Sequence, residues 1–254
     1  ISHYGTSRRQ REILMKIGIV DSGLGGIVVL KECIQQHKTA HFIYYGDYQH
    51  SPYGNKNDMQ LKSYYQAAMS FFLKQNCDLV IVACNTLATI IDPTEKRCVT
   101  PIMAVQKKII ESSSSNLIVL ATKRTIQSKV YDFQKCNLVA CPRFVKKIEK
   151  NPQSDYHKVV CHYLKKYPNA KTIVLGCTHY QLLKETIQNH FLHPITIIDS
   201  SEELVRQLSF KNSPLKIDLY VTKLTRRIQK NIATLLKNES YQLQKIKKDE
   251  ISSF

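Results

Sequence analysis

Residues 16–23, KIGIVDSG, decide the fold: a short apolar run leads directly into small and polar residues. A run of this kind is typical of a strand that is buried on both faces of a parallel sheet. The same pattern recurs along the chain at 42–45, 79–83, 117–120 and 172–175, and stretches such as 58–75 and 181–190 show helical spacing. Alternating strands and helices predict an α/β fold with mainly parallel sheets. We expect the tail, 242–254, to be the end of a helix.

Length and composition restrict the class of protein. The chain has 254 residues, of which 43% are hydrophobic and 22% are charged, so it can form one large domain or two small ones and is not a disordered chain. No apolar run approaches the roughly 18 residues of a membrane-spanning helix. The first 14 residues lack the apolar stretch of a signal peptide. We expect translation to start at Met15, a non-native or disordered lead over 1–14, no contact with a membrane, and a cytoplasmic location.

The cysteines do not form a recognisable framework. The chain has eight of them, without a C-x-x-C pair and without an export signal, so we expect reduced thiols in a cytoplasmic protein. The group Cys136, Cys141, His157 and Cys161 does not match the ligand spacing of a familiar zinc site, and we predict no metal.

Two cysteines stand at equivalent places. The stretches 79–86, LVIVACNT, and 172–179, TIVLGCTH, each place a cysteine after a buried strand, and Cys84 and Cys177 lie 93 residues apart. Open α/β sheets bind ligands at the carboxyl ends of their strands. A cysteine that leads into a helix there has its thiolate favoured by the helix dipole and by free N–H groups. The pattern predicts two similar lobes that face one another, although two coincidentally buried thiols remain the alternative.

Two opposed thiols suit the inversion of a stereocentre. One cysteine, as thiolate, removes a proton from one face of a carbon, while the other, as thiol, donates a proton to the opposite face. A thiol with an ordinary pKa of about 8.5 can reach both states near neutral pH. Hydrogen-bond donors must stabilise the charge that develops on the substrate, and suitable side chains nearby are Ser22, Asn85, Thr86 and Thr178. Asp21 and His179 are suited to assist proton transfer or to orient a substrate ammonium group.

The glycine-rich stretch 23–26, GLGG, does not predict a nucleotide site. A dinucleotide fingerprint would need a third glycine where Val28 stands, and the chain has no Walker-type phosphate loop. We interpret these glycines as a tight turn that lets a ligand carboxylate approach backbone N–H groups.

Five motifs together resemble the bacterial glutamate racemases of the aspartate/glutamate racemase family. In family order they are DSGLGG at 21–26, YGD at 45–47 with PYG at 52–54, ACNT at 83–86, the segment 122–128, and LGCTHY at 175–180. The resemblance runs from Met15 to about Leu236. It implies cofactor-independent interconversion of L- and D-glutamate, with D-glutamate supplied for peptidoglycan synthesis, and a homodimer. It also implies an active site in the cleft between two α/β lobes, the first formed by 15–103 with 210–254 and the second by 104–209.

The resemblance also implies roles for individual residues. Cys84 would deprotonate D-glutamate with help from Asp21, and Cys177 would deprotonate L-glutamate with help from His179. Glu149 matches an acidic residue near the pocket. Thr122 and Thr125 would lie near the side-chain carboxylate of the substrate. The complete set of implied substrate-binding residues is Asp21, Ser22, Tyr53, Gly54, Asn85, Thr86, Thr122, Thr125, Thr178 and His179.

Some positions depart from the family pattern. Leu87 replaces an alanine and adds bulk beside the site, so a racemase for aspartate or another acidic amino acid remains open. Gln181 replaces a proline, and Lys146 and Lys147 replace a Pro-Leu pair.

The net charge is not explained by racemase chemistry. The formal charge is +17, and residues 123–171 alone carry twelve basic and three acidic side chains. Such a surface attracts polyanions. We find no nucleic-acid-binding motif and do not expect nucleic acid as a partner. A non-catalytic polyanion-binding protein on this scaffold remains the third hypothesis.

Overall fold

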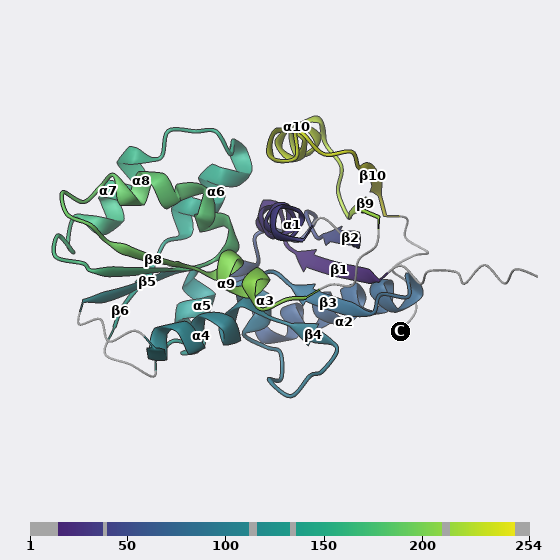
Figure 1. Cartoon of the computed structure of the whole chain (residues 1–254), viewed down its shortest axis with the longest axis horizontal. Helices are drawn as coiled ribbons and strands as arrows, with labels where there is room; N and C mark the ends of the chain where they lie inside the picture. Colours follow the sequence, from purple (N-terminus) through teal and green to yellow (C-terminus); the bar gives the residue numbers. More distant parts are fainter. Residues whose placement is uncertain (1–14, 38–39, 112–115, 133–135, 210–213, 247–254) are drawn as a thin grey trace, which may run out of the picture.

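The protein forms two parallel sheets, seen in a computed structural model that describes residues 15–37, 40–111, 116–132, 136–209 and 214–246 (Figure 1). The larger sheet has the order β10 (Gln242–Lys245), β9 (Lys216–Val221), β2 (His41–Gly46), β1 (Lys16–Asp21), β3 (Leu79–Val82), β4 (Cys98–Val99). The smaller sheet has the order β6 (Asn137–Ala140), β5 (Leu117–Ala121), β7 (Thr172–Gly176), β8 (Thr196–Asp199). Every strand pairing among the described residues is parallel, which confirms the predicted α/β fold with two lobes.

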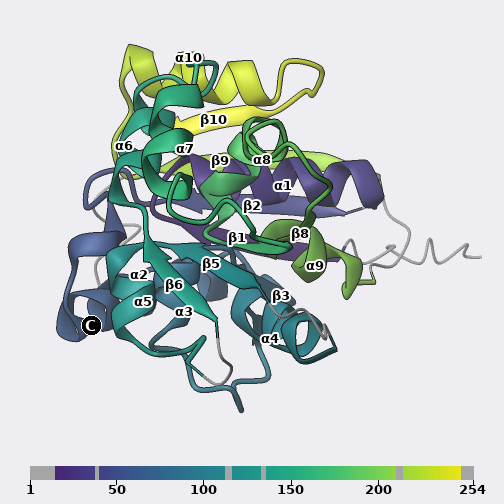
Figure 2. The same ribbon diagram turned by 90° about the vertical axis from the view of Figure 1, so that its left-hand side faces the viewer.

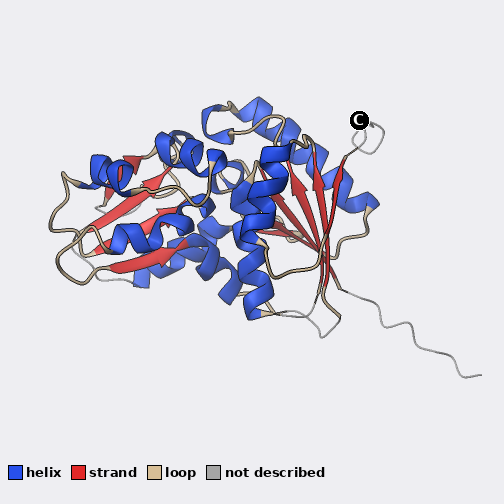
Figure 3. Ribbon diagram, turned by 90° about the horizontal axis from the view of Figure 1, so that it is seen from above, coloured by secondary structure: helices blue, strands red, loops and turns tan. Residues whose placement is uncertain are grey.

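Helices cover both faces of each sheet (Figures 1 and 2). On the larger sheet, α1 (Leu24–Gln36) and α10 (Arg226–Leu235) cover one face and α2 (Asp58–Lys74) covers the other. On the smaller sheet, one face carries α6 (Pro142–Lys150), α7 (His157–Leu164) and α8 (Lys184–Gln188), and the other carries α4 (Pro101–Glu111) and α5 (Lys123–Gln127). The short helices α3 (Asn85–Ala88) and α9 (Ser200–Arg206) lie between the sheets (Figure 1), and the view from above shows helices packed between the two sets of strands (Figure 3). None of the described helices is long and apolar enough to cross a membrane.

The apolar core explains why the strands read as continuous hydrophobic runs. Ile17, Ile19 and Val20 of β1 are fully buried, because helices lie over both faces of the sheet. One cluster of buried side chains includes Leu24 of α1 together with Leu120 and Leu175 from the central strands of the smaller sheet. The two lobes therefore share apolar packing through α1, and this packing sets how their strand ends face each other.

Two predicted helices differ from the structure. Residues 181–190 are not one helix: the chain forms a 3-10 turn over Thr178–Leu183 and only then enters α8. The tighter turn buries Tyr180, whose hydroxyl donates to the carbonyl oxygen of Cys141 at 3.0 Å. The prediction of a helix end at 242–254 is wrong where the structure describes it, because Gln242–Lys245 is the edge strand β10 beside β9. Residues 247–254 lie outside the described residues.

The predicted lobe boundaries remain a prediction. The first, near Met103, falls within α4, whose bounds are Pro101–Glu111. The second, near residue 210, lies outside the described residues, as does the predicted lead over 1–14.

Close packing of α2 on β1 generates the first prediction. A side-chain carbon at Gly18 would lie 2.7 Å from Cδ1 of Phe72, which is closer than carbon atoms approach. We expect Gly18→Ala to lower the free energy of unfolding by about 1–3 kcal/mol, because the added methyl overpacks this contact. Urea denaturation measures the change. Phe72→Leu in the same chain should recover part of the loss, and purely additive effects of the two substitutions would contradict the proposed contact.

Candidate active site

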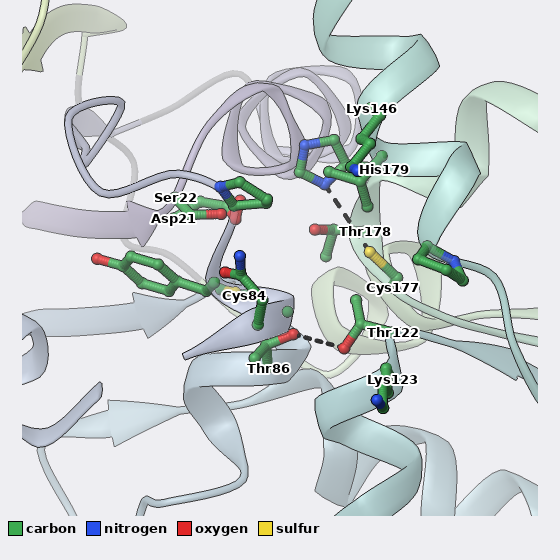
Figure 4. Close-up of a pocket in the computed structure, with 16 residues that line it drawn as sticks. Asp21, Ser22, Cys84, Thr86, Thr122, Lys123, Lys146, Cys177, Thr178 and His179 are labelled. Atoms are coloured by element: carbon green, nitrogen blue, oxygen red, sulfur yellow. Dashed lines mark hydrogen bonds between the residues drawn. The ribbon is translucent and has the colours of Figure 1, made fainter. Parts of the chain in front are cut away.

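The central strands of the two sheets end at one cavity of about 170 Å³ (Figure 4). In the larger sheet, β1 leads to Asp21 and Ser22 and β3 leads to Cys84; in the smaller sheet, β5 leads to Thr122 and β7 to Cys177. A protein cavity of about 150 Å³ can hold benzene, so this cavity has the size of a small organic molecule. Its lining residues are Asp21, Ser22, Pro52, Tyr53, Gly54, Asn55, Cys84, Thr86, Thr122, Lys123, Pro142, Val145, Lys146, Cys177, Thr178 and His179.

Cys84 stands at the N-terminus of α3, on the side of the cavity that the larger sheet forms. Its sulfur accepts a 3.5 Å hydrogen bond from the N–H of Leu87. Burial raises the pKa of the Cys84 thiol well above its ordinary value, and the nearby Asp21 carboxylate raises it further, against the lowering effect of the Leu87 N–H. Near neutral pH, Cys84 is therefore a thiol that can donate a proton.

Cys177 stands on the opposite side of the cavity, next to a buried histidine (Figure 4). Nδ1 of His179 lies 3.8 Å from Sγ of Cys177, and Nε2 of the same ring lies 2.7 Å from Oε1 of Glu149. Burial alone would lower the pKa of His179, but the contacts with Cys177 and Glu149 raise it well above its ordinary value. A protonated His179 places a positive charge and an N–H donor beside the Cys177 sulfur.

The position of the proton on His179 follows from the shorter contact. The N–H of Gly25 also points to Nε2, at 3.2 Å, and it would require this nitrogen to be an acceptor. The carboxylate of Glu149 is 0.5 Å closer and carries a negative charge. We therefore assign a proton to Nε2, which donates to Glu149.

Asp21 is a buried carboxylate with no hydrogen-bond partner among the described residues. Both of its oxygens are unpartnered, and the side chain lines the cavity. Burial raises the pKa of Asp21 to about 6; His179 opposes this rise and Glu149 adds to it. Near neutral pH the group is mostly ionised, so the cavity holds a negative charge that a ligand cation, such as an ammonium group, would satisfy.

Three threonine hydroxyls form a chain where the lobes meet. Oγ1 of Thr86 lies 2.9 Å from Oγ1 of Thr122, which in turn lies 3.0 Å from Oγ1 of Thr125. Thr122 also begins α5, since its hydroxyl accepts the N–H of Thr125 at 3.2 Å. Thr86 and Thr122 line the cavity, whereas Thr125 lies behind them. The arrangement offers hydroxyl donors to an anionic group of a ligand.

The loop with Tyr53 and Gly54 is held by a buried carboxylate. The hydroxyl of Tyr53 donates to Asp47 at 2.7 Å, and Thr222 donates to the same carboxylate at 2.9 Å. The Tyr53 ring is thereby held in place, and the loop lines the cavity through residues 52–55.

Two predicted site residues do not reach the cavity. Thr125 is the inner member of the threonine chain. The side-chain amide of Asn85 donates to the hydroxyl of Ser200 at 3.1 Å, and its carbonyl oxygen accepts from Tyr131 at 3.1 Å. Both residues therefore support their neighbours from behind.

The glycine-rich stretch forms the tight turn into α1, and its approach to a ligand carboxylate stays a prediction. One N–H at the start of α1 has a partner in the protein, because the Glu149 carboxylate accepts the N–H of Leu24 at 2.7 Å. A side-chain carbon at Gly23 would lie 2.1 Å from that carboxylate, and one at Gly25 would lie 2.4 Å from Oγ1 of Thr178. The missing side chains thus let Glu149 and the segment after Cys177 approach α1.

The departures from the family pattern have clear places in the structure. Leu87 is fully buried among the apolar side chains under β1 and β3 and does not line the cavity, so the predicted crowding of the site is wrong. Gln181 donates to Glu32 of α1 at 3.1 Å, and Lys147 lies over the Tyr156 ring at 5.9 Å. Lys146 lines the cavity.

Sequence reasoning missed several lining residues, namely Pro52, Asn55, Lys123, Pro142 and Val145. Lys123 directly follows Thr122, and Pro52 belongs to a quoted motif, so these two carried a signal. Pro142 and Val145 reach the cavity because α6 packs against the 3-10 turn Thr178–Leu183 that follows β7, which no local pattern indicates.

No group of three or more His, Cys, Asp or Glu side chains in the described ranges could hold a metal ion. What the site offers chemically is two thiols on opposite sides of a small cavity, one paired with a carboxylate and the other with a histidine.

Comparisons with known proteins agree with this geometry. A model of the Asp/Glu/hydantoin racemase family matches residues 29–208. The glutamate racemase of Fusobacterium nucleatum subsp. nucleatum is 37% identical over 214 residues, or 77% of this chain and 80% of that relative. The glutamate racemase of Oceanobacillus iheyensis is 35% identical over 213 residues, or 76% and 77%. The crystal structure of glutamate racemase from Francisella tularensis subsp. tularensis SCHU S4 in complex with D-glutamate superimposes with a TM-score of 0.79 at 25% identity, covering 92% of this chain and 97% of that chain.

The different surroundings of the two thiols generate the second prediction. Thiolates react with iodoacetamide and thiols do not, so at pH 7 we expect Cys177, beside a protonated His179, to be alkylated faster than Cys84. Peptide mass spectrometry at successive times gives both rates in one sample. His179→Asn should lower the alkylation rate of Cys177 and leave that of Cys84 unchanged. The unchanged rate of Cys84 also serves as the control for folding. Equal rates in the unaltered protein would contradict the proposed asymmetry.

Proposed function

We propose that this chain, which belongs to the Asp/Glu/hydantoin racemase family and is an amino-acid racemase and hence an isomerase, interconverts L- and D-glutamate. The observation that carries the proposal is the single small cavity with Cys84 on one side and Cys177 on the other. The glutamate racemases of similar sequence, and the D-glutamate in the Francisella tularensis complex, support glutamate as the substrate.

The reaction is a transfer of two protons across the substrate. The Cys177 thiolate removes the α-proton of L-glutamate, the electron pair stays on the α-carbon and its carboxylate, and the Cys84 thiol donates its proton to the opposite face. The product is D-glutamate, with Cys84 now a thiolate and Cys177 a thiol. The reverse reaction starts from that state. The raised pKa of Cys84 and the charge of His179 favour the state that acts on L-glutamate.

The other residues bind and orient the substrate in this proposal. The unpartnered Asp21 carboxylate pairs with the substrate ammonium. Asp21 also assists proton transfer at Cys84, as His179 does at Cys177. Ser22, Thr86 and Thr178 donate hydrogen bonds to the α-carboxylate, on which charge develops in the transition state. Thr122 binds the side-chain carboxylate, with Thr125 behind it. Tyr53 and Gly54 shape the wall of the cavity, and Asn85 orients the Cys84 turn through Ser200.

Glu149 is the positioning residue of this set. It touches His179 and the start of α1 at once, so it fixes the imidazole and joins the two lobes beside the reacting atoms. We also propose that the enzyme works in the cytoplasm, where its eight cysteines, all free in the structure, stay reduced, and that D-glutamate enters peptidoglycan synthesis. The predicted homodimer remains a prediction.

The function is tested with the purified protein and each enantiomer of glutamate, by polarimetry or chiral chromatography. We expect both enantiomers to reach the same racemic mixture without an added cofactor. Aspartate lacks one methylene group and should react at least about tenfold more slowly. No turnover of either enantiomer by folded protein would contradict the proposal. Faster turnover of aspartate than of glutamate would show that aspartate is the substrate.

The roles of the thiols are tested by single substitutions. Cys84→Ala and Cys177→Ala should each lower kcat by at least ~100-fold, because each removes one of the two proton-transfer groups. Cys161→Ala, at a half-buried cysteine of α7 outside the cavity, is the matched control and should keep full activity. Substantial activity in either of the first two variants would contradict the two-thiol mechanism.

A further inference from the structure

Helices α6 and α7 form a basic groove beside the active site, on the outer face of the smaller lobe (Figure 1). We call it the α6–α7 groove; its volume is about 690 Å³. More than half of its lining side chains are cations. The lining residues are Arg143, Lys146, Lys147, Lys150, Asn151, Ser154, Lys158, Val159 and His162.

The positive charge of this groove is only partly balanced by carboxylates of the same segment. The sequence between residues 142 and 167 holds only two carboxylates, Glu149 and Asp155. Glu149 turns inward to His179, and Asp155 accepts the backbone N–H of His157 at 2.9 Å. None of the five lining Lys and Arg side chains forms an ion pair with any residue that the structure describes.

A second groove shows the contrast. On the other side of the active-site cavity, residues 54–59 together with Lys123, Arg124 and Gln127 line a hollow of similar size that also holds cations. There, Arg124 pairs with Asp58, so part of the charge is neutralised. In the α6–α7 groove, like charges lie side by side and repel one another, and a bound polyanion would remove this repulsion.

The lining groups indicate the chemistry of the ligand. Lysine and arginine side chains are donors without acceptor capacity, and Asn151 and Ser154 add an amide and a hydroxyl donor, which suits phosphate oxygens. The cations of α6 run from Arg143 to Lys150, about 10 Å along the helix axis, which is longer than one phosphate. No Phe, Tyr or Trp is among the described lining residues, so His162 is the only aromatic ring that this described lining offers for stacking a nucleobase.

The groove meets the active site at one residue. Lys146 lines both the α6–α7 groove and the active-site cavity, and Glu149 follows it one turn later on the same helix. An anion in the groove would lie beside Lys146, and therefore next to the cavity that would take up glutamate, itself an anion. It would offset the charge of Lys146 and weaken the attraction of the cavity for its substrate.

We propose that the α6–α7 groove binds a short oligophosphate, and that the bound anion raises the KM of the neighbouring active site for glutamate. The first part is independent of the catalytic activity, and the second rests on the proposed function. The competing explanation is that the polyanion is attracted to the net charge of +17 of the whole chain and not to this groove. The experiment is designed to distinguish binding at the groove from this general attraction.

Binding is measured by calorimetry with inorganic tripolyphosphate at low salt. We expect one site per chain, with affinity lowered about tenfold or more by the charge reversals Lys150→Glu and Lys158→Glu together. The matched control is Lys96→Glu with Lys107→Glu, at exposed lysines of the loop before β4 and of α4, on the other side of the molecule (Figure 1). This control changes the net charge equally and should bind as the unaltered protein does.

The second readout is glutamate racemisation at saturating tripolyphosphate. We expect a higher KM with unchanged kcat in the unaltered enzyme, and no change of KM in the Lys150→Glu, Lys158→Glu variant. No binding, equal weakening by both double variants, or an unchanged KM would each overturn the proposal. The assignment to an oligophosphate would be overturned if short duplex DNA bound more tightly than tripolyphosphate and if the Lys150→Glu, Lys158→Glu variant lost this binding. Absence of racemisation without tripolyphosphate would count against the proposed function and leave the binding result unaffected.

Discussion

The structure depends on one constraint: the carboxyl ends of the central strands of two parallel sheets must meet at one cavity. β1 and β3 bring Asp21 and Cys84 from the larger sheet, and β5 and β7 bring Thr122 and Cys177 from the smaller sheet. In a parallel sheet all strands end at the same edge, so two sheets that face edge to edge present two sets of polar side chains to one ligand. A small amino acid held there is reached from both faces.

The buried charges at this junction are arranged unequally. On one side, Glu149, His179 and Cys177 form a line in which a carboxylate holds an imidazolium beside a sulfur. On the other side, burial raises the pKa of the Cys84 thiol, and the negative charge of Asp21 raises it further. Because these residues are buried, apart from the partly exposed Glu149, their charges act in a medium of lower dielectric constant than water and their effects are larger than at the surface. Glu149 belongs to one lobe and binds the start of α1 in the other, so catalysis and the docking of the lobes depend on the same carboxylate.

Much of the fold could be predicted because buried parallel strands and their terminal residues are local patterns. The apolar runs from 16–20 to 172–175 mark five strands, and residues that follow four of them line the cavity; the exception is the run 42–45, after which Asp47 holds Tyr53 from behind. The prediction for the tail failed because the edge strand β10 has four residues, of which Leu243 alone is partly buried. So short a pattern does not distinguish an edge strand from the end of a helix. The contribution of Lys146 and Val145 could not be predicted, since it depends on how α6 packs against the turn Thr178–Leu183 after β7. The prediction that Leu87 adds bulk beside the site was wrong, because sequence position does not show that its side chain turns into the core.

The central claim, that each thiol serves one face of the substrate, is tested most directly by where deuterium appears. L-Glutamate is incubated with the enzyme in deuterated water, and the reaction is stopped at an early time. The enantiomers are then separated, and mass spectrometry measures the deuterium content of each. With two thiols, the D-glutamate formed carries deuterium at its α-carbon, because Cys84 donates a solvent-derived nucleus, while the remaining L-glutamate keeps its protium. Starting from D-glutamate should give the mirror result. Product that keeps the original α-proton, or substrate and product that gain deuterium at the same rate, would show that a single base serves both faces.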